Sequence, residues 1–497
     1  MAKQPTRFDR LVMLALVLFA AASFTSNAAD NDLWGHLRFG HDFLAHGLLR
    51  TDPYSYTRAA QPWTEHEWGS EIVFAALWER AGAPGLILLK AALGAGAVAL
   101  LLRLAWETSA SSVAVAVVAV PAVLGLFPWF ATRPQIWTSC FFAVTLFAIL
   151  RARRGDLRSA AALPLVVIAW VQLHGGFLAG LGVLGLATAA EAAERWWRRE
   201  PLPGELLAVL GACLAATLVS PYGPAYALGV LRDAAMPRPD ILEWQPLGPA
   251  AVRFVPMLAM VPVVLALAAV ALAATPRGWS ATELVLLAAS AVLTLRHARH
   301  APFFFLTALA VLPRHLAAAG RVFASRRAAF VTAAVVGGLA VARVVPAAGA
   351  IAHLTVRASA FPIGAVRFLE HTGLGGNVAV DFNWGSYLIG TCYPRCRVSI
   401  DGRYEAAYPP ELYAANRALV KGTPGWARLL TDYPTEIVLL PTASGGAARL
   451  AGRAGWALVY RDPVASVFLR DLPRFRPVIE RFAAAPATAP LEDDVLE

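Results

Sequence analysis

The chain has 497 residues, of which 58% are apolar and only 15% are charged, and its mean hydropathy is +0.56. A soluble domain of ordinary composition has about a quarter charged residues and slightly under half apolar ones. A water-soluble domain cannot bury long apolar runs such as 11–29, 110–127 and 255–274 on all sides. The composition therefore excludes a globular cytosolic enzyme, a fibre and a disordered chain, and indicates an integral membrane protein.

The net charge of +10 would suggest nucleic-acid binding in a soluble chain. In a membrane protein, Lys and Arg collect in cytoplasmic loops instead. No basic cluster interleaved with exposed aromatic residues lies outside the membrane flanks, so we expect no nucleic-acid partner. Four cysteines are too few for a disulfide scaffold, and Cys140 and Cys213 fall in apolar runs as packing residues.

About eleven segments meet the requirement of roughly 20 mostly apolar residues for a spanning helix. They are 11–29, 84–102, 110–127, 134–150, 160–175, 176–193, 204–220, 253–274, 280–296, 301–314 and 328–348. The first is preceded by Lys3, Arg7 and Arg10, as in a signal peptide. Its apolar stretch is longer than a usual signal core, and residues 27–29 form a marginal cleavage site, so we expect a retained anchor.

Charged flanks predict which side each loop occupies. Alternation from a cytoplasmic N-terminus places the basic loops inside, as the positive-inside rule expects; they hold Arg103, 151–158, 195–199, Arg277 and 314–327. The outer side then receives 30–83, 128–133, 174–176, 221–252, 296–300 and everything after 348. We therefore expect a transmembrane domain over 1–348 with a long first outer loop, 30–83.

The segment 349–480 predicts a small α/β domain on the outer side. Helices are expected at 362–371 and near 411–420, and short strands at 377–382, 397–401, 436–440, 456–460 and 465–469. Cys392 and Cys396 would then lie in an oxidising compartment, where a local disulfide and a free pair are both open. The Ala/Pro-rich and then acidic end, 481–497, is expected to be disordered.

The first outer loop carries an unusual density of polar groups. Asp30 and Asp32 lie two residues apart near His36, where the first span leaves the membrane, and His66 and Glu67 follow at the far end of the loop. Such carboxylates hold a divalent cation or raise one another's pKa, and a carboxylate so tuned can deprotonate an acceptor hydroxyl. The alternative is that Asp30 or Asp32 caps the following helix.

Cationic groups end several predicted spans on the same outer side. They are Arg133, His174, Arg296, His297, Arg299 and His300. Ionisable residues near membrane depth are costly and tend to face a cavity or a partner, and Arg binds phosphate bidentately. Taken singly, Arg133 has the alternative of snorkelling to the interface and His174 that of a satisfied core histidine. Together with the acidic loop, the set favours a reaction in which a lipid-linked phosphate leaves and a hydroxyl attacks.

The layout resembles the GT-C membrane glycosyltransferases and, more closely, a largely uncharacterised bacterial multi-spanning group related to them. The resembling segments are 32–37, 52–57, 66–68, 133–135, 174–177, 220–223, 383–388 and 400–405. The resemblance implies Asp32 as the catalytic or metal-binding acid, with Asp30 as a second candidate. From the residues themselves, Glu67 is a further catalytic candidate, and we expect His36, His66 and the cationic set to bind the donor phosphate or substrate.

The resemblance further implies a polyprenyl-phosphate-linked sugar donor and transfer to a glycan, lipid or protein acceptor on the outer face of a bacterial cytoplasmic membrane. A divalent cation, Mg²⁺ or Mn²⁺, would be held by Asp30 and Asp32. One departure is that GT-C enzymes often show an adjacent acidic pair, whereas Asn31 separates the two here.

In the tail, Trp384, Asp401 and Arg403 are candidates for a sugar-binding surface, and the alternative is a buried Asp401–Arg403 pair that holds two strands together. Two other function classes stay open for the whole chain. One is a transporter or flippase of lipid-linked sugars, and the other is a non-catalytic assembly factor for envelope polysaccharide. The middles of the predicted spans are poor in charge, Lys90 apart, which favours the transferase over the transporter.

Overall fold

The computed structural model describes residues 4–236, 238, 241–320, 323 and 325–497. The chain divides into two compact units, one comprising Met1–Ser26 and Ile87–Ala352 and the other Asn27–Leu86 and His353–Glu497. The first outer loop therefore groups with the C-terminal segment. This differs from the expected division at residue 348, which placed the loop in the transmembrane domain.

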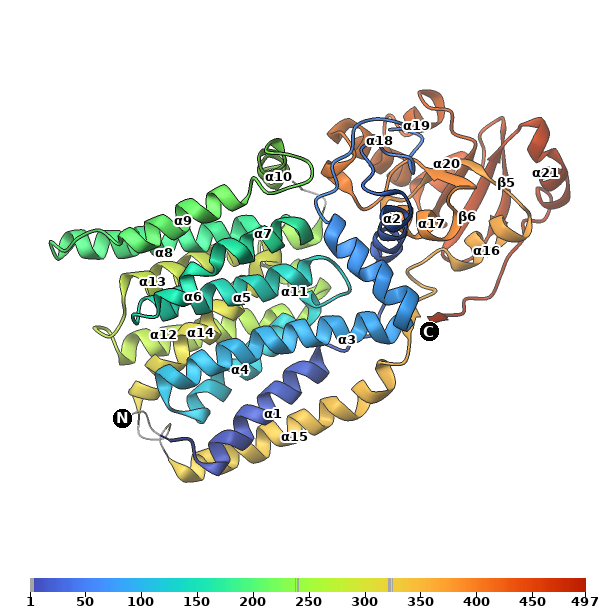
Figure 1. The fold of residues 1–497 in the computed structure, drawn as a ribbon. Coiled ribbons are helices and arrows are strands. Elements are labelled where there is room, and N and C mark those ends of the chain that lie inside the picture. The colour runs from blue at the N-terminus through green and yellow to red at the C-terminus, as the bar shows by residue number, and fades with distance from the viewer. Residues whose placement is uncertain (1–3, 237, 239–240, 321–322, 324) are drawn as a thin grey trace. The chain divides into compact units, whose positions relative to one another are not determined.

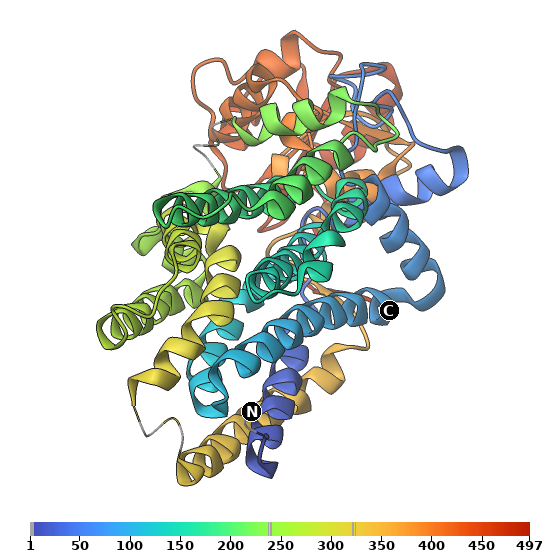
Figure 2. The same cartoon turned by 60° about the vertical axis from the view of Figure 1, so that its left-hand side comes forward.

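The first unit is helical throughout its described part. Its helices are α1 (Arg7–Ser23), the second half of α3 (Trp68–Ser109), α4 (Ser112–Leu126), α5 (Gln135–Ala152), α6 (Leu157–Ala161), α7 (Leu163–Leu173), α8 (Phe177–Trp197), α9 (Gly204–Ala216), α10 (Ala225–Ala234), α11 (Pro249–Phe254), α12 (Met260–Ala274), α13 (Ala281–Arg296), α14 (Ala301–Ala319) and α15 (Arg326–Ala350). Figures 1 and 2 show α1, in dark blue, lying along α15, in gold.

Each of the eleven predicted spans falls on a helix of this unit. Seven helical segments of the described chain are long and apolar enough to cross a membrane: Trp68–Ser109, Ser112–Trp129, Gln135–Ala152, Phe177–Trp197, Pro256–Ala274, Ala298–Ala319 and Arg326–Ala350. The first predicted span, 11–29, ends early, at Ser23, because the chain beyond it becomes extended and bonds to Thr355 through the Asn27 carbonyl (2.8 Å) and the Ala29 N–H (3.0 Å). The chain is thus a multi-pass, mostly helical membrane protein.

The basic loops expected on one side of the membrane meet in the structure. Arg151 Nη1 lies 2.7 Å from Glu107 Oε2, which joins the ends of α3 and α5. Arg153 Nη1 lies 2.5 Å from Glu191 Oε2 on α8, and Arg314 Nη2 donates to the Gly278 carbonyl before α13 over 2.8 Å. We call this region, formed by residues 103–110, 150–158, 191–198, 275–283 and 310–315, the Arg-rich end.

The second unit contains a five-stranded sheet in the order β3-β2-β4-β6-β5. Its elements are α2 (Leu33–His46), the first part of α3, β1 (Leu354–Val356), α16 (Ile363–His371), β2 (Gly376–Val380), α17 (Gly385–Cys392), β3 (Cys396–Val398), α18 (Pro410–Lys421), α19 (Arg428–Thr431), β4 (Ile437–Pro441), α20 (Gly445–Leu450), β5 (Trp456–Arg461), β6 (Ala465–Arg470), α21 (Arg476–Phe482) and β7 (Asp494–Leu496). Strands β3, β2 and β4 are parallel, and β6 and β5 are antiparallel additions. Every strand and helix predicted for 362–469 is present.

The first outer loop extends this sheet at its β3 edge. The Tyr56 N–H donates to the Val398 carbonyl, and the Val398 N–H donates to the Tyr54 carbonyl, each over 3.1 Å. Tyr54 and Ser55 are fully buried, and the Tyr56 hydroxyl contacts Thr435 Oγ1 at 2.7 Å. The loop is therefore part of the core of the second unit.

The C-terminal end, expected to be disordered, forms β7, which pairs antiparallel with β1. Its acidic residues supply the reason, since Asp493 accepts the Ala358 N–H over 2.7 Å and Asp494 lies 3.2 Å from Arg367 Nη2. Composition alone gives no sign of these partners. Cys392 and Cys396 are both buried free thiols, which is one of the two states left open for them.

Candidate active site

Asp30 and Asp32 lie at the turn that starts α2. The Asp32 N–H donates to the Asp30 carboxylate over 3.0 Å, and Asp32 is the N-cap residue, although its side chain makes no capping hydrogen bond. Residues four apart share one face of a helix, so His36 follows Asp32 on the same side. The turn and the first turn of α2 therefore place the side chains of Asp32 and His36 on the same side of this helix.

A group of three ionisable side chains gathers where α2 meets the start of α3. His36 Nδ1 lies 3.0 Å from Glu71 Oε1 and 3.9 Å from Glu67 Oε2. Glu67, the residue before α3, and Glu71 are one helical turn apart, and the Glu71 N–H donates to the Glu67 carbonyl, so both carboxylates lie near His36. Glu71 is 1% exposed, and its Oε2 atom has no hydrogen-bond partner in the described structure.

A third carboxyl, that of Glu65, lies next to this group. Glu65 is 2% exposed and accepts the Glu67 N–H over 2.9 Å. Burial raises the pKa of Glu65 to about 7, although the neighbouring His66 opposes this shift. His66 is closer to Glu67, with 3.7 Å between its Nε2 and the Glu67 Oε1. The loop thus holds a carboxyl that binds and releases a proton near neutral pH.

The His36–Glu67–Glu71 group has the composition of a metal centre. One ligand atom from each residue can be chosen so that all three lie within 4.8 Å of one another, and the orphan Glu71 oxygen lacks any other partner. A mixed imidazole and carboxylate set suits Mn²⁺ or Zn²⁺ better than Mg²⁺, which prefers oxygen ligands. In the described chain this group does not include Asp30 or Asp32, the pair expected to hold the ion.

Asp32 lies against a loop of the C-terminal sheet domain. A Cβ atom built on Gly402 would fall 1.9 Å from Asp32 Oδ1, and the Gly402 N–H donates to Ser386 Oγ over 3.3 Å. Likewise, a Cβ atom built on Gly35 would lie 3.2 Å from Ser386 Oγ. Glycines 35 and 402 therefore let α2 and this loop come together around Asp32.

The side chains of the three C-terminal candidates are buried, which favours the alternative of a buried structural pair over a sugar-binding surface. Trp384 is 5% exposed and donates its indole N–H to the Ala360 carbonyl over 2.8 Å. Arg403 donates Nε to Asp401 over 2.9 Å, and its Nη1 lies 3.1 Å from Asp52 Oδ1. Asp401 is fully buried, so the alternative, a structural pair, describes it better.

Arg403 joins the first outer loop to the sheet domain. The carbon of its guanidinium lies over the rings of Trp63 (4.6 Å to the centroid) and Phe39 (5.0 Å). Burial alone would raise the pKa of Asp401, but the charge of Arg403 and its hydrogen bonds outweigh burial and lower it. A buried, bidentate pair of this kind leaves neither group available to a substrate.

The remaining predicted phosphate ligands belong to the first unit. His174 Nδ1 accepts the Gly176 N–H over 2.8 Å and contacts Thr138 Oγ1 at 2.7 Å, so this ring holds the turn between α7 and α8. Arg133 lies in the turn before α5, partly buried. Both are therefore built into turns between helices, as the sequence placed them.

The 296–300 turn contains the other four cationic candidates. His297 Nδ1 contacts the Trp244 carbonyl at 2.6 Å, and Arg299 forms an ion pair with Glu243, which offsets its charge. His300 Nδ1 lies 3.4 Å from the Leu293 carbonyl, and Arg296 is exposed at the end of α13. The structure brings these residues together with one another and with the 243–245 segment.

Sequence reasoning missed two members of the acidic site, Glu65 and Glu71. The available signal was the spacing of Glu67 and Glu71, which places both on one face of a helix. That signal was weak because helix α3 had been predicted to begin only at residue 84. The structure starts α3 at Trp68 and bends it at Gly82, whose φ of +53° is in the left-handed region.

No protein-family model and no curated protein sequence matches the chain. Solved structures do match it. An oligosaccharyltransferase from Archaeoglobus fulgidus in the apo form superposes with a TM-score of 0.58 and 11% identity, over 93% of this chain and 74% of that chain. ArnT from Cupriavidus metallidurans bound to undecaprenyl phosphate gives 0.51 and 14%, over 92% and 97%. Both are GT-C glycosyltransferases, so this chain has the GT-C fold.

Proposed function

We propose that this chain is a membrane glycosyltransferase that moves a sugar from a polyprenyl-phosphate-linked donor to a glycan, lipid or protein acceptor. The observation that carries the proposal is the His36–Glu67–Glu71 group, two of whose members are buried, next to Asp32 in a chain with the GT-C fold over nine-tenths of its length. The undecaprenyl phosphate bound to the ArnT structure supports a polyprenyl donor. The membrane arrangement we propose has eleven spans, a cytoplasmic N-terminus and the second unit on the outer face of a bacterial inner membrane.

In this reaction Asp32 acts as the general base. Its carboxylate accepts the proton of the acceptor hydroxyl while the hydroxyl oxygen bonds to the anomeric carbon of the sugar. The bond from that carbon to the phosphate oxygen breaks, and its electron pair leaves with the phosphate. Arg and His side chains stabilise the charge that develops on the departing phosphate. The side chains to which we assign this role are His66, Arg133, His174, Arg296, His297, Arg299 and His300.

His36, Glu67 and Glu71 would hold a divalent cation. Such an ion supplies positive charge next to the phosphate and orients it. The protein's own contribution is to hold these three side chains in place, because Glu71 is buried and α2 and α3 pack directly against each other. Glu65, with a pKa near 7, can remain neutral behind them and so limits the negative charge of the loop.

The test compares Asp32→Asn with Asp432→Asn in the full-length protein. Asp432 is half-exposed and pairs with Arg428 on the surface of the same unit, so it controls for the same chemical change. We expect Asp32→Asn to abolish sugar transfer, measured by mass spectrometry of lipid-linked and surface glycans, while binding of polyprenyl phosphate persists. Transfer that survives in Asp32→Asn at the level of the control would refute the assigned base.

A separate measurement addresses the ion. Purified protein is washed with a chelator, reloaded with Mn²⁺, and its metal content is determined by elemental mass spectrometry. Glu71→Gln should lower the bound metal at least tenfold, because it removes the buried carboxylate whose second oxygen has no other partner. Asp30→Asn should leave the metal content unchanged. A loss of metal in Asp30→Asn but not in Glu71→Gln would instead support the Asp30–Asp32 pair as the metal site.

A further inference from the structure

The Arg-rich end contains a cavity that the proposed reaction does not use. Its volume is about 160 Å³, which is on the order of ten water-sized spheres. Its apolar lining comes from Leu104, Leu150 and Ala310, which are buried residues of α3, α5 and α14. Arg153, Arg154 and Arg314 also line it, with Glu283 as the one carboxylate among the lining residues.

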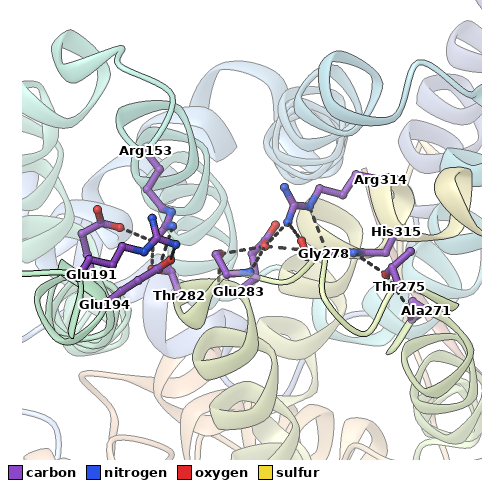
Figure 3. Close-up of polar contacts among 12 residues, drawn as sticks. Arg153, Glu191, Glu194, Ala271, Thr275, Gly278, Thr282, Glu283, Arg314 and His315 are labelled. Atoms are coloured by element: carbon purple, nitrogen blue, oxygen red, sulfur yellow. Dashed lines mark hydrogen bonds and ion pairs between the residues drawn. The ribbon is translucent and has the colours of Figure 1, made fainter. Parts of the chain in front are cut away.

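Two of these arginines are held in place by carboxylates. Arg153 extends between Glu191 and Glu194, whose oxygens lie 2.5 and 3.6 Å from its Nη atoms. Arg314 bonds to Glu283 and donates to the Gly278 carbonyl, as Figure 3 shows. The bonds of Arg314 use Nε and Nη2. In the described structure its Nη1 atom is therefore available to a ligand.

Arg154 is the least neutralised of the three. Its Nη1 lies 3.9 Å from Glu107 Oε2, and this same oxygen is 2.7 Å from Arg151 Nη1. The other oxygen of Glu107 accepts from Arg103 over 3.0 Å. One carboxylate thus faces three guanidinium groups. Burial lowers the pKa of Arg154, and the charges of Arg314 and Arg151 lower it further, as expected for a crowded cation.

We infer that this cavity binds the phosphate group of a phosphate ester, with Arg154 and Arg314 Nη1 as its donors. The guanidinium group of arginine can donate two parallel hydrogen bonds to two phosphate oxygens. A basic pocket between membrane helices suits a lipid headgroup whose chains lie against apolar residues. Leu104, Leu150 and Ala310 supply the apolar lining that lipid chains require. Inorganic phosphate offers the same oxygen acceptors as a lipid phosphate, and the experiment distinguishes these two ligands.

The experiment titrates full-length protein in detergent with dioctanoyl phosphatidic acid, with dioctanoylglycerol, which lacks the phosphate, and with inorganic phosphate. Binding is followed by calorimetry for the wild type, Arg154→Gln and Arg158→Gln. Arg158 is an exposed arginine of the adjoining helix α6 that does not line the cavity, which makes it the matched control. Loss of one charged hydrogen-bonding group should weaken binding about tenfold in Arg154→Gln and less than twofold in Arg158→Gln.

Each outcome decides the inference. Phosphatidic acid that binds with this pattern, while dioctanoylglycerol does not, supports a lipid phosphate, and the same pattern for inorganic phosphate alone supports a soluble ester. Equal affinity of Arg154→Gln and Arg158→Gln, or no binding of either phosphate, overturns it. Should Arg154→Gln not fold, Arg154→Lys replaces it, since a loss of the fork alone must still weaken binding severalfold. Sugar transfer plays no part, so failure here leaves the proposed function untouched.

Discussion

At Gly402, the position of a single side chain can be tested without removing any functional group. A methyl group at residue 402 would fall 1.9 Å from Asp32 Oδ1 and 3.2 Å from Ser386 Oγ. Both neighbours are ends of side chains that can turn away, so we expect Gly402→Ala to displace the Asp32 carboxylate with little loss of stability. Sugar transfer should fall about 100-fold, since a misplacement of about 1 Å costs that much.

Gly452→Ala is the control for this variant, because nothing lies within 4 Å of a Cβ atom at that position of the same unit. The two variants should share one melting temperature. Normal transfer by Gly402→Ala at full stability would show that the position of the Asp32 carboxylate does not matter.

The buried Arg403 predicts a large effect on stability. Arg403→Met leaves Asp52 and Asp401 buried without their cation, and breaking a buried pair in this way costs about 3–5 kcal/mol. The exposed pair of Arg428 and Asp432 provides the comparison, because removal of such a pair costs at most about 1 kcal/mol. Differential scanning fluorimetry of Arg403→Met and Arg428→Met should show this ranking, and equal melting temperatures would contradict the assignment of Arg403 as a structural residue.

The same pair predicts a pH dependence with a definite sign. The pKa of Asp401 is lowered in the folded protein by Arg403, so its contribution to stability is present above the unfolded value of about 3.9 and is lost as the pH falls through the folded value. Without the cation, burial raises the pKa of Asp401, and acidification then stabilises the fold. The melting temperature of the wild type should thus fall on acidification below about pH 4. In Arg403→Met this slope should be reduced or reversed.

At the scale of elements, the contact between α2 and α17 positions the acidic site. A Cβ atom on Gly390 would lie 2.5 Å from Trp34 Cβ and 3.0 Å from the Trp34 carbonyl oxygen. Alanine is the better helix former by about 1 kcal/mol, but overpacking costs about 1–3 kcal/mol. Because backbone atoms of α2 would have to move, we expect Gly390→Ala to destabilise the protein by about 1–2 kcal/mol in chemical denaturation.

This result should be the opposite of that for Gly402→Ala, which contacts only movable side-chain ends. A stable Gly390→Ala protein would mean that α2 and α17 do not pack as closely as the structure has them.

The sequence could predict elements wherever a local pattern determines them. Each of the eleven predicted apolar spans falls on a helix, seven of which are long and apolar enough to cross a membrane in the described chain. Alternation with turn residues predicted β2 to β6. It could not predict that residues 54–56 join the β3 edge or that β7 pairs with β1. These are pairings between segments more than 100 residues apart, and their backbone hydrogen bonds leave no periodic signature.

The candidate site divides along the same line. Asp32, His36 and Glu67 are locally conspicuous because charged groups cluster at the end of an apolar run. Glu71 is not conspicuous in the sequence, because it is a single acidic residue within a helix. Only its contact with His36 on α2 makes it part of the site. For Asp401 and Arg403 the sequence left two interpretations open, a sugar-binding surface and a buried pair, and the contact of Arg403 with Asp52 of the first outer loop favours the buried pair.

At the scale of the whole molecule, the proposed topology predicts opposite locations for the Arg-rich end and the second unit. The test uses Arg158→Cys and Asp432→Cys in a chain whose four native cysteines are replaced by alanine. Both target positions are exposed, so a membrane-impermeant thiol reagent can reach either from its own side. In intact spheroplasts we expect Asp432→Cys alone to react, and in inside-out vesicles Arg158→Cys alone, because arginine-rich loops stay in the cytoplasm. Reaction of both from one side would contradict the assignment of the sheet domain and the acidic site to the face where the lipid-linked donor is used.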